Sequence, residues 1–354
     1  MDKNCCCPDV SPSASSGGQL FVPLAPRQKK EAAVALTTLS AWDILGACKV
    51  RLGIGRAKYT VEPGLYAAGS PGGDSPVLVS ANYKLTFDIL RGNLSGLDCW
   101  LLILDTKGVN VWCAAGKGTF GTNELVRQIE QTGLSGFVAH RKLIVPQLGA
   151  PGVCAHEVAR RTGFSVTYGP VRASDIKAFI ASGCIATPEM RKVRFTLWDR
   201  LILTPVDLLA AAKKSLFLFG VLFLLNLVAA RPFGIYDLIA YAGAVLAGTV
   251  IAPALLPFIP GRSFAWKGWL VGLSWTALVL VLFKEYSPTA MIGYLLLLPA
   301  VSAWLALEFT GASTFTSPSG VLKEMRIAVP LIIGSAGIGA LLLVAQAFVI
   351  GRAV

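Results

Sequence analysis

Charged residues and histidines are scarce in this sequence of 354 residues. Only 15% of the residues are charged, and the two histidines are His140 and His156. Two histidines are too few for a multi-histidine metal centre. The hydrophobic share of 54% and the mean hydropathy of +0.62 are too high for an ordinary soluble globular protein. Part of the chain is therefore predicted to lie in a membrane.

Several familiar site motifs are missing. "AAGKGT" resembles a phosphate loop, but G-x-x-x-x-G-K-[ST] requires glycine where Val111 stands and serine or threonine where Gly118 stands. The G-x-S-x-G elbow of serine hydrolases and any nucleic-acid-binding motif are absent. Residues 1–34 contain no apolar core of the signal-peptide type. We expect no nucleic-acid partner and an N-terminal region that stays in the cytoplasm.

The eight cysteines show no paired C-x2-C spacing that would hold zinc or an iron–sulfur cluster. We therefore expect no iron–sulfur cluster in this chain, and a reducing cytoplasm disfavours a disulfide framework. Cys99 and Cys184 are interpreted as small buried residues. Cys5, Cys6 and Cys7 open a polar tail, predicted as disordered over residues 1–40. Three adjacent thiols suit a soft metal, but a tail without a role is the simpler interpretation.

Five stretches approach the 20 or so apolar residues that cross a bilayer: 208–230, 238–259, 266–283, 286–307 and 327–350. Basic residues gather at one set of ends, namely Arg191, Lys192, Arg194, Arg200, Lys213, Lys214, Arg262, Lys267, Lys323 and Arg326. The opposite ends carry only Arg231, Lys284 and Arg352. This asymmetry predicts a multi-pass protein of the inner (cytoplasmic) membrane, with its N-terminal domain in the cytoplasm and its C-terminus outside.

We interpret the five spans as a membrane anchor for the chain. Asp237, Glu285 and Glu308 all lie near predicted ends, and no acidic or histidine relay appears at mid-depth, as a transporter would require. The net charge of +12 favours anionic lipid or an acidic protein as a partner. We divide the chain into the tail, a cytoplasmic domain at 41–190, a basic linker at 191–207 and an all-α transmembrane domain of five helices at 208–354.

The cytoplasmic domain alternates strands with helices. Strands are predicted at 76–83, 98–105 and 164–171, and helices at 83–94, 124–133, 152–163 and 174–183. This alternation is typical of an α/β fold with a Rossmann-like parallel sheet covered on both faces. Ligands of such sheets bind beyond the carboxyl ends of the strands. The loops to examine are therefore 80–83, 105–117, 146–152 and 168–174.

The loop at 105–117 contains a cysteine in an unusual setting, "NVWCAAGK". Asn110 is a good N-cap, which places Cys113 at about the third position of a helix, where the thiolate is favoured. Lys117 follows four residues later on the same face. The small residues 114–116 would let a large flat group approach the sulfur. These features suit a thiolate presented to a bulky metal ligand, and equally a buried cysteine in a small-residue packing seam.

This octapeptide strongly resembles the signature of the membrane corrinoid protein of the microbial mercury-methylation pair. "VLVSANYKLTFDILR", "GTFGTNELV", "LGAPGV" and "YGPVRA" resemble the rest of that family's corrinoid domain. That domain is in turn similar to the corrinoid iron–sulfur protein of the acetyl-CoA pathway. The resemblance covers about residues 45–190 and extends to the five spans that follow, and the cysteine triplet is no part of it.

The resemblance implies a cobamide (cobalamin) bound with its own base displaced, and Cys113 as the catalytic residue and lower axial ligand of cobalt. The motif D-x-H-x-x-G of histidine-ligated corrinoid proteins is absent, in agreement with cysteine ligation. The helix from Asn110 to Lys117 would cap the lower face of the corrin. The implied cofactor-binding residues are Ser80, Ala81, Asn82, Tyr83, Asn110, Val111, Trp112, Cys113, Ala114, Ala115, Gly116, Lys117, Thr119, Thr122, Gly149, Ala150, Pro151, Gly152, Gly169, Pro170, Val171 and Arg172.

The implied activity is corrinoid-dependent methyl transfer to Hg(II), which makes methylmercury. A thiolate trans to the methyl group would favour departure of the carbon with its electrons, as an electrophilic mercuric ion requires. The implied partners are a ferredoxin-like protein with two [4Fe-4S] clusters, as electron and mercury donor, and a folate-linked methyl donor. A membrane-tethered corrinoid methyl carrier with another acceptor is the alternative. A transporter with a regulatory cytosolic domain is a third.

Overall fold

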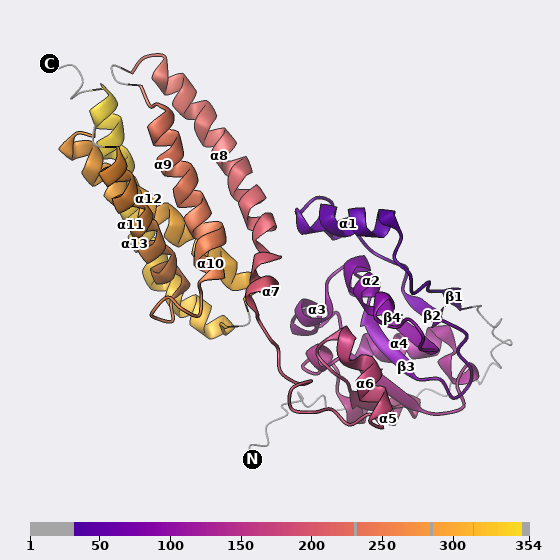
Figure 1. Cartoon of the computed structure of the whole chain (residues 1–354). Helices are drawn as coiled ribbons and strands as arrows, with labels where there is room; N and C mark the ends of the chain where they lie inside the picture. The colour runs from indigo at the N-terminus through magenta and orange to yellow at the C-terminus, as the bar shows by residue number, and fades with distance from the viewer. Residues whose placement is uncertain (1–31, 230–231, 284–285, 314, 349–354) are drawn as a thin grey trace, which may run out of the picture. The chain divides into compact units, whose positions relative to one another are not determined.

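The computed structural model describes residues 32–229, 232–283, 286–313 and 315–348. Cys5, Cys6, Cys7 and residues 1–31 of the predicted tail lie outside this range. The described chain has an N-terminal α/β domain and a C-terminal helical region (Figure 1).

The α/β domain is built on a six-stranded sheet with the order β1-β2-β4-β3-β5-β6. The strands are β1 (Ala33–Val34), β2 (Gly64–Ala68), β3 (Val77–Ala81), β4 (Cys99–Leu104), β5 (Lys142–Val145) and β6 (Ser165–Tyr168). The strands β3 to β6 are parallel as predicted, but β2 runs antiparallel to β4. The prediction of a wholly parallel sheet is therefore wrong, and the sheet is mixed. Only residues 69–76 join β2 to β3, too few for the helical crossover that parallel strands need.

Helices cover both faces of the sheet. On one face lie α3 (Val111–Lys117), α4 (Thr122–Thr132) and α5 (Ala155–Thr162), and on the other lie α2 (Lys84–Gly92) and α6 (Ile176–Ala181) (Figure 1). Successive residues of a strand point to opposite faces. Accordingly Val77 and Val79 belong to the core cluster under α4 and α5, and Leu78 belongs to the cluster under α2 and α6.

The first two elements of the described chain, β1 and the helix α1 (Ala41–Arg51), were not predicted from the sequence. Ala33–Val34 lies in the segment predicted as a tail, yet it pairs with β2 and the following Ala35 is only 3% exposed. The helix α1 begins at a capping box in which Ser40 and Asp43 bond each other's backbone N–H groups. The apolar residues of α1 do not mark its buried face in the sequence, because that face carries Asp43, Gly46 and Ala47 beside the single buried Val50.

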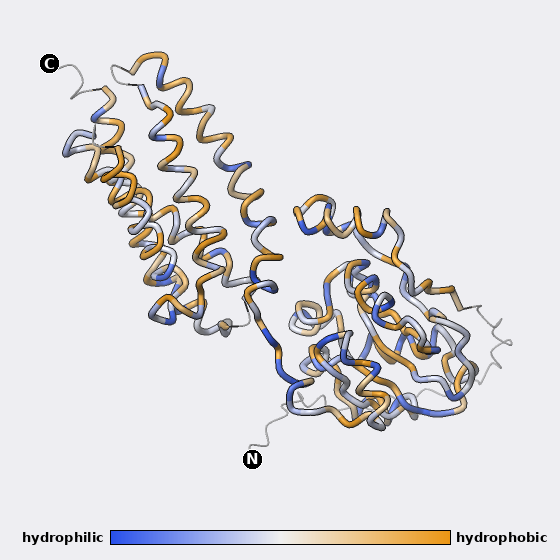
Figure 2. The backbone as a smooth tube through the Cα atoms, in the orientation of Figure 1, coloured by the Kyte–Doolittle hydropathy of each residue, from blue (hydrophilic) through white to orange (hydrophobic). Residues whose placement is uncertain are grey.

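The C-terminal region contains five helices that are long and apolar enough to cross a membrane, as predicted. Its elements are α7 (Leu197–Leu201), α8 (Thr204–Asn226), α9 (Ile235–Leu246), the π-helical turn η5 (Ala247–Ile251), α10 (Ala252–Ala254), α11 (Phe264–Leu282), α12 (Pro288–Glu308) and α13 (Pro318–Phe348). Figure 2 shows these helices to be predominantly hydrophobic.

Some helices of the C-terminal region are longer than the apolar stretches predicted from the sequence, because polar residues at their ends are helical as well. The helix α8 begins inside the predicted linker, and Lys323 and Arg326, predicted to precede the fifth span, lie within α13. Lys267, counted among the basic residues at the span ends, lies in the first turn of α11 and donates to the carbonyl of Leu256. Hydropathy identifies only the apolar part of a span, whereas the hydrogen-bonded helix extends beyond that part at its ends.

Candidate functional site

A cavity of about 350 Å³ lies at the carboxyl end of the parallel strands. The chain passes from β3 to β4 on one side and then crosses to β5 on the other, so β3 and β5 flank a topological switch point. The cavity is lined at this point by β3 and β5 and by the loops that follow β4, β5 and β6. Its lining residues are Leu78, Val79, Ser80, Thr86, Ile89, Leu90, Asn110, Val111, Trp112, Ile144, Pro146, Leu148, Gly169, Pro170, Val171, Ala173 and Ile176.

Cys113 follows directly after the three residues that α3 and its cap contribute to this cavity. Asn110 is the N-cap, and its Oδ1 accepts the backbone N–H of Cys113 at 2.9 Å. The predicted cap and the third helical position of Cys113 are confirmed. The thiol is half-buried, and Trp112 beside it is 41% exposed along the cavity. The thiol therefore sits on a turn of fixed orientation and remains accessible.

The loop that enters α3 is held by the buried side chain of Asn82. Its Oδ1 accepts the backbone N–H of Thr106 at 3.1 Å, the hydroxyl of Thr106 at 2.9 Å and the backbone N–H of Gly108 at 3.0 Å. Glu124 of α4 accepts the backbone N–H of Asp105 at 2.8 Å. Asn82, predicted to contact the cofactor, thus positions the loop before α3. Ala81 and Tyr83 beside it are buried as well.

Residues 27–180 match the family model of the CO dehydrogenase/acetyl-CoA synthase delta subunit. The chain is 35% identical over 151 residues to the acetyl-CoA decarbonylase/synthase complex subunit gamma of Methanopyrus kandleri, covering 41% of this chain and 32% of that protein. The subunit of the same name from Methanocaldococcus jannaschii is 30% identical over 153 residues, covering 42% and 31%.

The chain therefore spans about a third of the length of the curated relatives that it matches. The matched region coincides with the α/β domain, and the helical region lies outside it. The likeness to the acetyl-CoA pathway predicted from the sequence is supported. The likeness to the mercury-methylation pair is not tested by these relatives.

A second group of predicted site residues packs behind α3 and does not line the cavity. An added Cβ at Gly152 would lie 2.1 Å from the carbonyl oxygen of Phe120 and 3.2 Å from the Cα of Ala115. One at Gly149 would lie 2.5 Å from the ring of Phe120. The small residues here let the loop pack against the backbone of α3. The residues of this group are Thr119, Thr122, Gly149, Ala150 and Gly152, whereas the neighbouring Pro151 is exposed and does not line the cavity either.

Within α3 the small residues are divided between two sides. Ala114 and Ala115 are buried in the core, whereas Gly116 and Lys117 are exposed. The packing seam considered in the sequence thus consists of the two alanines, while the thiol of Cys113 remains accessible at its edge. Arg172 follows the lining residues Gly169, Pro170 and Val171 but does not line the cavity.

Sequence reasoning missed the apolar wall of the cavity. Thr86 and Ile89 come from α2, Ile144 and Pro146 from the end of β5, and Ile176 from α6. The sequence offered no signal for this wall, and only the structure shows that Ile89 is 45% exposed on a helix otherwise packed against the sheet. Apolar residues without a motif are assigned to a site only when the fold brings them together.

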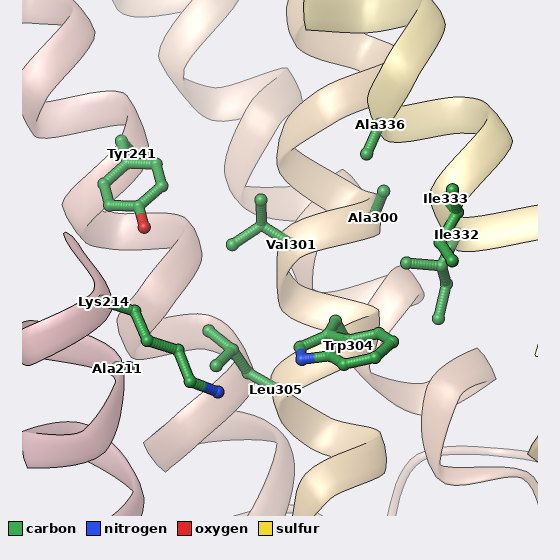
Figure 3. Close-up of a pocket in the computed structure, with 10 residues that line it drawn as sticks. All are labelled: Ala211, Lys214, Tyr241, Ala300, Val301, Trp304, Leu305, Ile332, Ile333 and Ala336. Carbon is green, nitrogen blue, oxygen red and sulfur yellow. The ribbon is translucent and has the colours of Figure 1, made fainter. Parts of the chain in front are cut away.

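The helical region has a separate cavity of about 390 Å³, lined by α8, α9, α12 and α13 (Figure 3). At one end Lys214 pairs with Glu308 at 2.7 Å, and the indole N–H of Trp304 donates to the same carboxylate at 2.9 Å. The rest of the lining is almost entirely apolar. Buried hydroxyls in this region, such as Thr249 and Thr276, donate to carbonyls of their own helix.

Proposed function

We propose that the α/β domain binds a cobamide at the carboxyl end of its sheet, with Cys113 as the lower ligand of cobalt, and that the chain transfers a methyl group to Hg(II). The observation that carries this proposal is the accessible thiol of Cys113, fixed by the Asn110 cap directly beside the cavity at the switch point. The similarity of residues 27–180 to subunits of acetyl-CoA synthase and decarbonylase complexes supports a corrinoid role for this domain.

The residues of the site fit such a group. A cavity of about 350 Å³ is near the lower end of the range for small-molecule sites, so it would enclose only a part of a cobamide, and its mostly apolar lining suits an apolar part of that group. Cys113 does not itself line the cavity, but it directly follows the lining residue Trp112 and offers a soft sulfur donor, whereas neither histidine is next to a lining residue. His140 bonds the carbonyl of Ser75 at 2.9 Å, before the start of β3, and His156 is exposed on α5.

Each part of the protein has a defined task in this proposal. Asn110 and the loop held by Asn82 orient the thiol, and Trp112 with the apolar wall from α2 and α6 would shield a bound cobamide from water. The exposed Gly116 leaves the surface beside the thiol open. When bound, the cobamide supplies the transferable methyl group, and thiolate ligation favours its departure as a carbanion equivalent that an electrophilic metal ion accepts.

The proposal extends to partners that this chain does not itself contain. A methyl group that departs with both bonding electrons would call for a low-potential donor that returns two electrons before the next methyl group is accepted. A ferredoxin-like protein with two [4Fe-4S] clusters meets this need and can deliver mercury through its thiols. A folate-linked system supplies the methyl group. In the proposed setting, the five apolar helices anchor the chain in the inner membrane.

The test is to reconstitute the full chain with cobalamin and compare it with Cys113→Ala and Cys154→Ala. Cys154 is also half-buried but lies at the N-cap of α5, so it controls for loss of a thiol. We expect Cys113→Ala to lose the optical and paramagnetic signature of sulfur-ligated cobalt. When the chains are loaded with methylcobalamin as the methyl source and unbound cofactor is removed, Cys113→Ala should form no methylmercury from Hg(II). Cys154→Ala should keep both. Retained methylmercury formation in Cys113→Ala would contradict the mechanism.

A membrane-tethered methyl carrier with another acceptor is the second candidate, and the names of the relatives favour it, since they belong to acetyl-CoA complexes. The same reconstituted chain separates the two candidates. Sulfur-ligated cobalt with rapid methylmercury formation supports mercury as acceptor. Sulfur-ligated cobalt that retains its methyl group in the presence of Hg(II) supports the alternative.

A further inference from the structure

The helix α1 buries Val50 and its small side chains on one side and exposes most of its large apolar residues on the other. Its inner face carries Gly46 and Ala47, and an added Cβ at Gly46 would lie 2.4 Å from the hydroxyl of Tyr59. On the outer side Trp42 is 80% exposed, Ile44 57% and Leu45 58%. A surface helix of a soluble domain normally has the opposite arrangement. The outer side of α1 is therefore suited to apolar surroundings.

Ion pairs hold α1 in this orientation. Asp43 on its inner face bonds Lys84 at 2.6 Å and Arg91 at 2.8 Å, both on α2. Asp88 bonds the same two cations at 2.7 Å each. The four side chains are largely buried, so this network resists screening better than surface pairs do. The helix cannot roll to bury Trp42 without breaking it.

The outer side of α1 and the turn after it is also strongly basic. The segment 41–58 carries four cations and one carboxylate, that of Asp43, which is already paired with α2. The cations are Lys49, Arg51, Arg56 and Lys58. Among the described residues none of these four forms a salt bridge, although Arg56 interacts electrostatically with Asp207, and three of them, Lys49, Arg56 and Lys58, are exposed. Apolar side chains flanked by unpaired cations are typical of helices that lie on anionic membranes.

We propose that the interfacial segment, residues 41–58, docks on an anionic bilayer surface. Trp42, Ile44 and Leu45 enter the boundary between headgroups and acyl chains, and the four cations contact lipid phosphates. Tryptophan prefers this boundary because its ring is apolar and its N–H is polar. The chain also carries five helices that can cross a membrane, which would keep the α/β domain close to such a surface.

Docking of this kind depends on lipid charge and on salt. Each basic residue near an anionic surface raises the ratio of docked to free segment about fivefold, and the attraction falls off within the Debye length, about 8 Å at physiological ionic strength and about 3 Å at 1 M salt. An apolar contact with another protein surface would show no such dependence on lipid composition.

The experiment uses the full chain in nanodiscs of phosphatidylcholine, with or without phosphatidylglycerol, and with bromine on the acyl chains close to the headgroup. The emission of Trp42 is obtained as the difference between the parent and Trp42→Phe. Trp100→Phe is the matched control, since Trp100 lies buried in the α/β core. Lys49→Glu with Lys58→Glu tests the charge, and Lys142→Glu with Lys177→Glu, two exposed lysines elsewhere on the domain, is its control.

We expect bromine to quench Trp42 in anionic nanodiscs, and expect this quenching to be lost in 1 M salt, in phosphatidylcholine alone and in the Lys49/Lys58 variant. The Lys142/Lys177 variant should behave as the parent, and Trp100 should not respond. Iodide access to Trp42 in anionic nanodiscs would overturn the proposal, because the segment would then be in water. Shielding of Trp42 that is independent of bromine and lipid charge would also overturn it and assign the cover to protein.

Discussion

At the scale of single residues, Cys99 and Cys113 show how surroundings decide what a thiol can do. Cys99 lies in β4 under the α2 face of the sheet, and its burial, assisted by the charge of Asp98, raises its pKa to about 12. Cys113 lies on the first turn of α3 and is partly exposed. Of these two thiols, only Cys113 is placed to meet a ligand.

This contrast predicts selective alkylation. At pH 8 a thiol with a pKa near 12 is thiolate in only about one molecule in ten thousand, and the thiolate is the reactive form. Because the pKa is raised, the reactivity of Cys99 should increase only as the pH approaches 12. Iodoacetamide at pH 8, followed by peptide mass spectrometry, should modify Cys113 and spare Cys99 in the folded chain, and modify both in urea. Equal modification in the folded chain would refute the assignment.

Two glycines near α3 give a second prediction at this scale. Gly152→Ala places a Cβ against the carbonyl of Phe120 and should destabilise the α/β domain by about 1–3 kcal/mol. Gly116→Ala is the matched control, because nothing lies within 4 Å of its added Cβ, and it should stabilise α3 by about 0.5–1 kcal/mol. Thermal unfolding of the full chain in detergent, followed by near-ultraviolet circular dichroism, should rank the two variants on opposite sides of the parent.

At the scale of elements, the attachment of α1 to α2 rests on charge more than on apolar packing. The hydrogen bond from Lys84 is the largest of the causes that hold the pKa of Asp43 far below its usual value, and bonds from Ser40 and Arg91 act in the same direction. The pKa of Lys84 is raised, because its bonds to Asp43 and Asp88 outweigh the opposing effect of burial.

The sign of this shift predicts how α1 responds to acid. A carboxylate whose pKa is lowered on folding contributes stability above its unfolded value of 3.8 and loses it as the pH falls further. Hydrogen exchange, corrected for intrinsic rates, should show α1 firmly attached from pH 8 to about pH 4 and released below that. In the Asp43→Asn variant, α1 should be released already at pH 7. Release of α1 in the parent near neutral pH would argue against the charge network.

The strands illustrate why part of the sheet escaped prediction. β3 and β4 are fully buried apolar runs and were recognised as such. β2 is "GLYAA", a short segment with weak strand preference, and its antiparallel pairing with β4 depends on a partner 35 residues later in sequence. The strand preference of a short segment does not predict a pairing that depends on which edge of the sheet is free.

At the scale of the whole molecule, the basic residues at the helix ends predict the orientation of the five apolar helices. The expected arrangement has the α/β domain in the cytoplasm and the C-terminus outside. In spheroplasts that express the full chain with different tags at its two ends, external protease should remove the C-terminal tag and spare the N-terminal one. The reverse pattern would place the α/β domain on the outer side and exclude a cytoplasmic electron donor.

The sequence alone determined the local features of this protein: the Asn110 cap, the position of Cys113 in α3, the alternation of strands and helices, and the five apolar helices. These follow from hydrogen bonding and hydrophobic periodicity between residues close in the chain. The tertiary structure decided which predicted site residues meet. It placed Ser80, Trp112 and Gly169 around one cavity, whereas Asn82 holds the loop before α3 and Gly152 packs against α3. Side chains that are distant in sequence share a site only through the packing of the sheet and its helices.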